Sequence, residues 1–186
     1  MQPMRTLHAA TLTLEPQLPD HAEAMFAVLS DLAIYQFGNH PPASLDALRQ
    51  RFERLAAGQS PDGQEHWLNW VVRLRDGTLA GYVQATLAAD GDTSVGYELA
   101  SACWGRGLGT QAVARMIEEL QAAYPMRRLQ ASLRPDNLRS MRLLLRLGFE
   151  PLATDPQQTT GLPVGWEDGD CRMHCPLPWR GLRPRA

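Results

Sequence analysis

A glycine-dense segment could bind an anion. Gly105, Gly107 and Gly109 follow a strand-like run at 93–99 and precede a helical pattern. Glycine allows the backbone to turn sharply and to approach a ligand closely. The first N–H groups of a helix have no intrahelical partner and lie at the positive end of its dipole, so a pyrophosphate fits there. The alternative interpretation is a strand–helix turn that is merely structural.

Glu98 is a candidate general base. It lies on the same predicted strand, with its side chain out of phase with those of Tyr97 and Leu99. A carboxylate at this position could take the proton of an ammonium group, directly or through a water molecule. The alternative interpretation is an exposed or hydrogen-bonded strand glutamate without a catalytic role.

The order of the predicted elements indicates how these residues are positioned. Apolar and polar patterns predict strands at 11–15, 66–74, 79–87, 93–99, 128–133 and 170–175. They predict helices at 20–31 (with an Asp20–Glu23 capping box), at 44–58, directly after the glycine segment, and at 137–147. A strand–helix–strand unit crosses over right-handedly and makes its two strands parallel. We therefore expect an α/β (α+β) fold with a mixed, mostly antiparallel sheet and helices on both faces.

Length and composition are those of one globular domain. The chain has 186 residues, of which 44% are hydrophobic and 20% charged, and it contains no repeat or linker. We expect a loose leader at 1–10, one domain at 11–178 and a basic tail at 179–186.

The basic residues restrict the chemistry. All 18 are arginine, which excludes a lysine Schiff base and a P-loop, whose lysine reaches the phosphates. A net charge of -2 argues against general nucleic-acid binding. Eight arginines and three acidic residues lie between Trp104 and Arg146, whereas the rest has ten arginines and 17 acidic residues. That third of the chain could face an anion, or the charges could lie on solvated helix faces.

The cysteines predict neither a disulfide framework nor a metal site. Three cysteines are too few and odd in number, which fits a reducing cytoplasm. Cys171 and Cys175 share one face of the predicted strand, whereas His174 lies on the other, and no second Cys or His pair completes four ligands. The chain has no run of 18 apolar residues and no signal-like N-terminus, so we expect a cytoplasmic protein without membrane association.

One interpretation of the glycine segment is a dinucleotide site. Residues 107–112 satisfy the Gly-x-Gly-x-x-Ala pattern. That fingerprint normally opens its domain and is followed about 20 residues later by an acidic residue, where this chain has Arg127 and Arg128. The preceding antiparallel strands also do not belong to such a fold. A nicotinamide-dependent oxidoreductase is therefore the weaker alternative.

Four motifs in order resemble those of the GNAT-superfamily N-acetyltransferases. They are Gly96-Tyr97-Glu98-Leu99, then Trp-Gly-Arg-Gly-Leu-Gly-Thr at 104–110, then Asn137-Leu138-Arg139-Ser140, and then Leu147-Gly148-Phe149. The second and third are most similar to the branch containing the Rim-type ribosomal-protein N-terminal acetyltransferases. The glycine motif alone is moderately specific. The resemblance spans roughly residues 11–178, and the order and spacing of the four motifs make it strong.

The resemblance implies direct acetyl transfer from acetyl-CoA to a primary amine of a small molecule or a peptide N-terminus. It implies a sheet splayed between the fourth and fifth predicted strands, with the pantetheine in the splay beside the backbone of Leu99 and Ala100. The pyrophosphate would bind the N–H groups from Gly105 to Thr110. The implied cofactor-binding residues are Leu99, Ala100, Trp104, Gly105, Arg106, Gly107, Leu108, Gly109, Thr110, Asn137 and Ser140.

The general acid departs from the pattern of the superfamily. Many members carry a tyrosine seven residues beyond the asparagine, where this chain has Leu144, which cannot donate a proton. Ser140 is the substitute that the Rim-like pattern suggests, because its hydroxyl could bond the thiol, although it could also be a plain helix serine. Asn137 could be only the N-cap of that helix. A CoA-binding sensor or scaffold without turnover is the alternative function.

The amine acceptor has the weakest signal. Glu65, His66, Trp67 and Trp70, with the segments 35–42 and 166–170, are plausible pocket walls. Core or edge packing is the alternative role of the two tryptophans. We expect a monomer or a homodimer.

Overall fold

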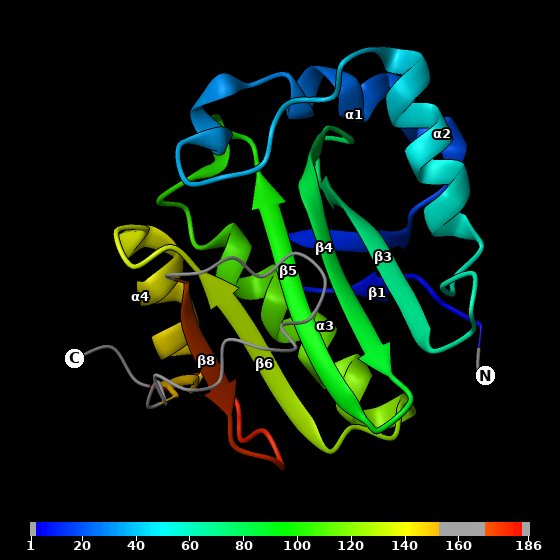
Figure 1. Ribbon diagram of the computed structural model, residues 1–186. Coiled ribbons are helices and arrows are strands. Elements are labelled where there is room, and N and C mark those ends of the chain that lie inside the picture. The colour runs from blue at the N-terminus through cyan, green and yellow to red at the C-terminus, as the bar shows by residue number, and fades with distance from the viewer. Residues whose placement is uncertain (1–2, 153–169, 184–186) are drawn as a thin grey trace.

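The computed structural model describes residues 3–152 and 170–183, whose strands form one eight-stranded mixed sheet (Figure 1). In spatial order the strands are β1 (Leu7–His8), β2 (Leu12–Pro16), β3 (Glu65–Leu74), β4 (Leu79–Ala88), β5 (Asp92–Leu99), β6 (Arg128–Leu133), β8 (Cys171–Cys175) and β7 (Glu150–Pro151). The helices are α1 (Ala22–Leu29), α2 (Leu45–Ala56), α3 (Leu108–Ala123) and α4 (Leu138–Arg146), with short 3-10 turns η1 (Pro19–His21), η2 (Leu32–Tyr35) and η3 (Ser101–Cys103). The predicted fold class is confirmed.

The sheet opens between β5 and β6, the parallel pair of the described sheet. Their register has three aligned pairs, which end at Ser94 and Gln130, and the strands diverge toward their C-terminal ends (Figure 1). The helix α3 connects them, as the crossover rule requires. The predicted splay is therefore present, and it leaves the end of β5 without a neighbouring strand on that side.

Helices cover both faces because the strands alternate their side chains. On β3, Trp70 packs in the larger cluster with α3, and Val71 packs in the smaller one with α1 and α2. Each of these two side chains is fully buried. The side chains that α3 buries against the sheet include Val113, Met116, Ile117 and Leu120.

The N-terminal segment was expected to be loose, but the structure attaches it to the rest of the domain. Leu7 is 1% exposed, and β1 pairs with β2. The Arg5 guanidinium donates two hydrogen bonds to the Glu119 carboxylate on α3 at 2.7 and 2.8 Å. The Arg5 carbonyl accepts a bond from the Trp70 indole at 3.1 Å. These partners are distant in sequence, so no local pattern predicted them.

The tail is also attached as far as it is described. The Trp179 indole donates to the Leu147 carbonyl at 2.7 Å, and the Arg183 N–H donates to the Arg146 carbonyl at 2.8 Å. Residues 179–183 therefore lie against the C-terminal end of α4.

The first helix begins differently from the prediction. The segment 20–31 divides into η1 and α1, and the expected Asp20–Glu23 capping box is wrong. The ring nitrogen Nδ1 of His21 instead accepts the Leu18 N–H at 3.0 Å. Pro19 explains the shift, because its fixed φ starts the turn one residue earlier.

Gly81 positions the strand that carries Glu98. It lies on β4 with φ +148°, and an added Cβ would lie 2.0 Å from the Glu98 carbonyl oxygen. We expect Gly81→Ala to lower the free energy of unfolding by about 3 kcal/mol or more, because backbone must move to relieve this contact. The matched control is Gly77→Ala, where φ is +87° and no atom lies within 4 Å. Chemical denaturation would measure both variants, and equal losses would contradict the steric explanation.

Candidate active site

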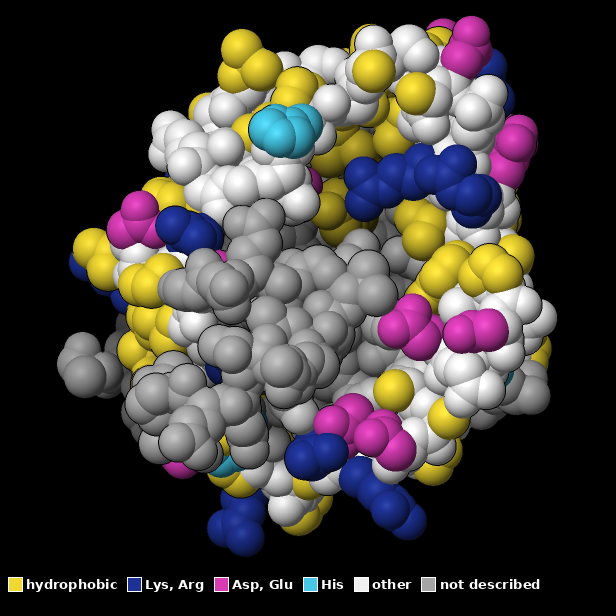
Figure 2. Space-filling view, viewed as in Figure 1, with side chains coloured by type: hydrophobic (Ala, Val, Ile, Leu, Met, Phe, Trp, Pro, Cys, Tyr) yellow, Lys and Arg dark blue, Asp and Glu magenta, His cyan; other side chains and the backbone are white. Residues whose placement is uncertain are grey.

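Two cavities meet at the splay of the sheet. The glycine-side cavity, about 500 Å³, is bounded by the end of β5, the glycine segment and α4. The sheet-side cavity, about 340 Å³, lies over β4, β5 and β6 and beside the segment 37–39. Figure 2 shows a hollow with yellow side chains, a class that includes Tyr, beside dark blue basic side chains. The residues common to both cavities are Ile34, Tyr97, Glu98, Asn137 and Ser140.

The glycine segment forms one wall of the glycine-side cavity. Gly105 and Gly107 have φ of +71° and +75°, and no atom lies within 4 Å of a Cβ added at either position. Gly107 is the N-cap of α3, and the Gln111 N–H makes the bond to the Gly107 carbonyl. The preceding N–H groups of the first turn, at 108–110, have no partner in the helix. A helix N-terminus with unpaired N–H groups, a geometry that suits an anion, thus lies at this wall.

Arginines surround this wall, as the charge distribution predicted. Arg139, Arg142 and Arg146 of α4 line the glycine-side cavity. Arg139 lies over the Trp104 ring, with 3.1 Å between its guanidinium carbon and the ring centroid. Arg106 is exposed and lies outside this cavity; it lines a separate one.

The edge of β5 offers free backbone groups. The Ala100 N–H bonds the Ala80 carbonyl at 2.9 Å, and the Leu99 carbonyl accepts the Trp104 indole N–H at 2.9 Å. Backbone groups alternate in direction along a strand. The Leu99 N–H and the N–H and C=O of Tyr97 therefore point toward the splay. Ala100, which was expected beside the cofactor, has its N–H inside the sheet and does not line the cavity.

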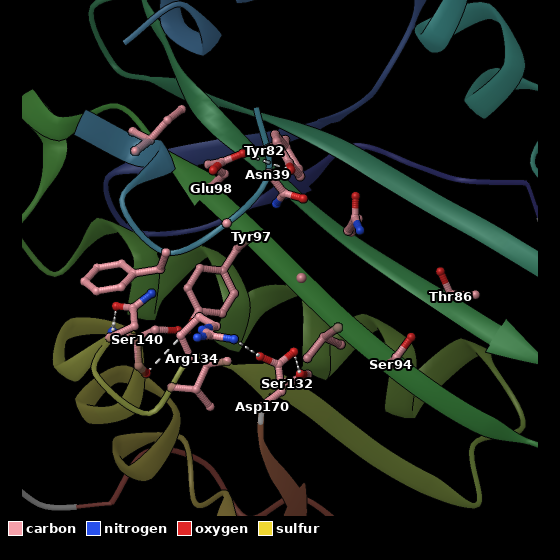
Figure 3. Close-up of a pocket in the computed structure, with 18 of the residues that line it drawn as sticks. Asn39, Tyr82, Thr86, Ser94, Tyr97, Glu98, Ser132, Arg134, Ser140 and Asp170 are labelled. Atoms are coloured by element: carbon pink, nitrogen blue, oxygen red, sulfur yellow. Dashed lines mark hydrogen bonds and ion pairs between the residues drawn. The ribbon is translucent and has the colours of Figure 1, made fainter. Parts of the chain in front are cut away.

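Glu98 lines both cavities, and Figure 3 shows it beside Tyr82 in the sheet-side cavity. The Tyr82 hydroxyl donates to Glu98 Oε2 at 3.1 Å. Burial raises the pKa of Glu98 above its usual range, and the Tyr82 bond and the charge of Arg51 offset part of that increase. Burial also raises the pKa of Tyr82, so its phenol stays a proton donor. A partly buried carboxylate with a raised pKa is suited to take a proton.

Ser140 is held by its own helix cap. The Asn137 side chain accepts the Ser140 N–H at 3.1 Å, so Asn137 is the N-cap of α4, as one of its two interpretations predicted. The Ser140 hydroxyl lies 2.6 Å from the Tyr97 hydroxyl. Leu144 is 1% exposed and packs in the larger core, away from both cavities. Of the predicted catalytic residues, the structure therefore brings Glu98 and Ser140 to the same junction.

Four further polar side chains line the sheet-side cavity and were not predicted from the sequence as site residues: Tyr97, Tyr82, Gln84 and Arg51. Tyr97 and Glu98 are adjacent in the quoted motif, which was the available signal for the first of them. The others come from distant segments and have no local signature.

Only part of the predicted acceptor walls lines the sheet-side cavity. From the segment 35–42, Phe37, Gly38 and Asn39 line the sheet-side cavity. From 166–170, Asp170 lies within the described residues and lines it as well; it accepts the Ser132 hydroxyl at 2.7 Å, and Arg134 lies 4.0 Å away (Figure 3). Residues 166–169 are outside the described part.

The four residues suggested on β3 do not line this cavity: Glu65, His66, Trp67 and Trp70. Trp70 is fully buried, and the Trp67 indole donates to Glu65 at 2.9 Å. Packing and edge contacts are therefore the observed roles of the two tryptophans.

No helix within residues 3–152 and 170–183 is long and apolar enough to cross a bilayer. No group of three or more His, Cys, Asp or Glu side chains in that part is placed to hold a metal ion.

Comparison with known proteins agrees with the geometry. Residues 11–150 match the family model described as an acetyltransferase (GNAT) domain. The chain is 25% identical over 162 residues to an uncharacterized N-acetyltransferase p20 of Bacillus licheniformis, covering 85% of this chain and 90% of that protein.

Solved structures share the fold. The ribosomal L7/L12 alpha-N-protein acetyltransferase RimL in complex with coenzyme A matches with a TM-score of 0.74, 17% identity and coverage of 91% and 96% of the two chains. The microcin C7 self-immunity acetyltransferase MccE in complex with acetyl-CoA and AMP matches with a TM-score of 0.72 and 17% identity. The match covers 88% of this chain and 91% of that one. Residues 11–150 match the family model, and the fold is that of solved acetyltransferases. The chain therefore belongs to the GNAT family of acetyl-CoA-dependent acetyltransferases.

Proposed function

We propose that this chain transfers the acetyl group of acetyl-CoA directly to a primary amine of a small molecule or a peptide N-terminus. The observation that carries the proposal is the junction of two cavities at Tyr97, Glu98 and Ser140. One cavity has an anion-binding helix N-terminus, and the other is polar and contains a carboxylate with a raised pKa. Donor and acceptor can therefore meet beside a base and a hydroxyl.

The glycine-side cavity fits acetyl-CoA. The open space beside Gly105 and Gly107 admits phosphates close to the backbone, and the N–H groups at 108–110 would bind them. The chain contains no lysine, so the positive charge beside the phosphates would come from the arginines of α4. The free Leu99 N–H and Tyr97 backbone groups would pair with the pantetheine amides. The bound cofactor supplies an activated acetyl thioester.

Glu98 and Ser140 would share the proton chemistry. Glu98 would take one proton from the acceptor ammonium and so leave a neutral amine that can attack the thioester, because its carboxylate lies where the two cavities meet. As the C–S bond breaks and the electron pair moves to sulfur, the Ser140 hydroxyl would donate a hydrogen bond to the developing thiolate. This role would compensate for Leu144, which lies in the core.

Thermal-shift measurements with acetyl-CoA, CoA and NADPH test the cofactor. We expect stabilisation by the two CoA compounds because only they match the pantetheine edge and the anion site. Stabilisation by NADPH alone would overturn the proposal.

A thiol-release assay tests turnover and the acceptor class. Peptide N-termini, polyamines, aminoglycosides and amino acids would be offered with acetyl-CoA, and we expect acceptor-dependent release of CoA. Binding of acetyl-CoA without release for any amine would instead support the sensor or scaffold function.

A further inference from the structure

We propose that Tyr97 is a positioning residue that directs the Ser140 hydroxyl toward the sulfur of the cofactor. The inference rests on the proposed function, because it needs CoA in the glycine-side cavity and Ser140 beside its thiol. Tyr97 comes from β5 and Ser140 from α4, so their contact bridges two of the elements that bound the glycine-side cavity.

The contact between the two hydroxyl groups is short and specific. Tyr97 Oη lies 2.6 Å from Ser140 Oγ and 3.4 Å from the Ser140 carbonyl oxygen. The first distance is a normal O–H···O bond, whereas the second is beyond the usual range. The Asn137 cap holds the Ser140 N–H, which fixes the backbone from which the hydroxyl projects. Both residues line both cavities, and Figure 3 shows them side by side in the sheet-side cavity.

The proton count determines the direction of the bond. Each hydroxyl has one proton to donate. Ser140 can donate to sulfur only if it accepts from Tyr97 rather than donating to it. Burial raises the pKa of Tyr97 to about 12, so the phenol remains protonated and can act as this donor throughout the neutral range. A hydroxyl that accepts one bond also donates a stronger one.

Tyr97 does not lose its proton in this role. When the C–S bond breaks, sulfur receives the electron pair. Glu98 already holds the proton of the acceptor ammonium, so the second proton of the nitrogen leaves to solvent. Ser140 stabilises the thiolate through its donated hydrogen bond, and solvent protonates the thiolate after release. Position 144 of α4 is a leucine and has no phenol. The phenol of Tyr97 instead reaches α4 from β5 through its contact with Ser140.

The acceptor-free complex with CoA provides a direct test. Ultraviolet absorption of the thiolate gives the pKa of the bound thiol in the native chain, Tyr97→Phe, Ser140→Ala and the double variant. We expect each single variant to raise this pKa by about 1 unit, because a hydrogen bond to a charged group weakens or disappears. The double variant should show no larger shift than Ser140→Ala alone. In turnover, Tyr97→Phe should lower kcat about 10-fold with little change in the KM for acetyl-CoA.

Two controls isolate the positioning role. Tyr124→Phe removes a buried phenol outside both cavities and should leave the thiol pKa unchanged. Ser140→Thr retains the hydroxyl, so the effect of Tyr97→Phe should persist in that background.

The outcomes separate this inference from the proposed function. If calorimetry detects no CoA binding to the native chain, both proposals fall. If CoA binds but Tyr97→Phe leaves the thiol pKa unchanged, or its shift adds fully to that of Ser140→Ala, only the role of Tyr97 is overturned.

Discussion

Replacement of Glu98 by glutamine is expected to lower kcat by about 10²–10⁴-fold, the usual contribution of a positioned general base. Glutamine keeps the shape of the side chain and can still accept the Tyr82 hydrogen bond, but it cannot take a proton. The affinity for acetyl-CoA should remain nearly unchanged, because the phosphate-binding wall is untouched. Steady-state kinetics and calorimetric titration with acetyl-CoA would measure the two effects separately.

The pH profile gives the same prediction a second readout. Glu98 must be ionised to act as a base, so kcat should rise as the pH rises through its pKa. Because burial raises that pKa, this acid limb should lie above the usual glutamate range. The limb should be absent in Glu98→Gln.

Stability should move in the opposite direction from activity. A carboxyl group whose pKa is raised on folding contributes stability below its unfolded pKa and loses it as the pH rises through the folded pKa. At neutral pH the native chain therefore contains an unfavourable ionised group, and Glu98→Gln should melt at the same or a higher temperature.

Glu65→Gln is the matched control for Glu98→Gln. Glu65 is also a half-buried strand glutamate with one hydrogen-bonded neighbour, but it lies outside both cavities. Its variant should retain full kcat. Unchanged kinetics in a folded Glu98→Gln protein would remove Glu98 from the role of base.

Gly107→Val is expected to weaken acetyl-CoA binding by about 100-fold or more, equivalent to losing two hydrogen bonds to a charged phosphate group. The valine side chain would occupy the open space at the cavity wall, where φ is +75° and no protein atom lies within 4 Å. The phosphates could then no longer approach the N–H groups at the start of α3. Isothermal titration calorimetry with acetyl-CoA would measure the loss.

Gly63→Val separates the steric effect from backbone strain. Gly63 has φ +70°, also has no atom within 4 Å of an added Cβ, and lies outside both cavities. Valine is strained at both positions because both have positive φ. The Gly63 variant should lose some stability but bind acetyl-CoA normally. Full affinity in Gly107→Val would refute the assignment of the glycine segment to the phosphates.

Several features could be predicted from the sequence because their causes act within a few residues. The alternation of apolar residues predicted most strands, and the apolar stripe after the glycine segment predicted α3. Gly105 and Gly107 require positive φ, which is a local property of the turn. Asn137 caps its own helix three residues away. The first helix shows the limit, since Pro19 and the ring of His21 replaced the expected cap.

The sequence by itself determined the mixed sheet, the glycine turn at the start of α3 and the position of Glu98 on β5. Only the tertiary structure decided which side chains meet. Tyr97 and Ser140 are 43 residues apart, and Arg5 and Glu119 are 114 apart, yet each pair is in hydrogen-bond contact. The burial that raises the pKa of Glu98 is likewise decided by the tertiary structure. Local preferences act over one or two turns of chain, whereas contacts across the splay depend on how the strands and helices pack together.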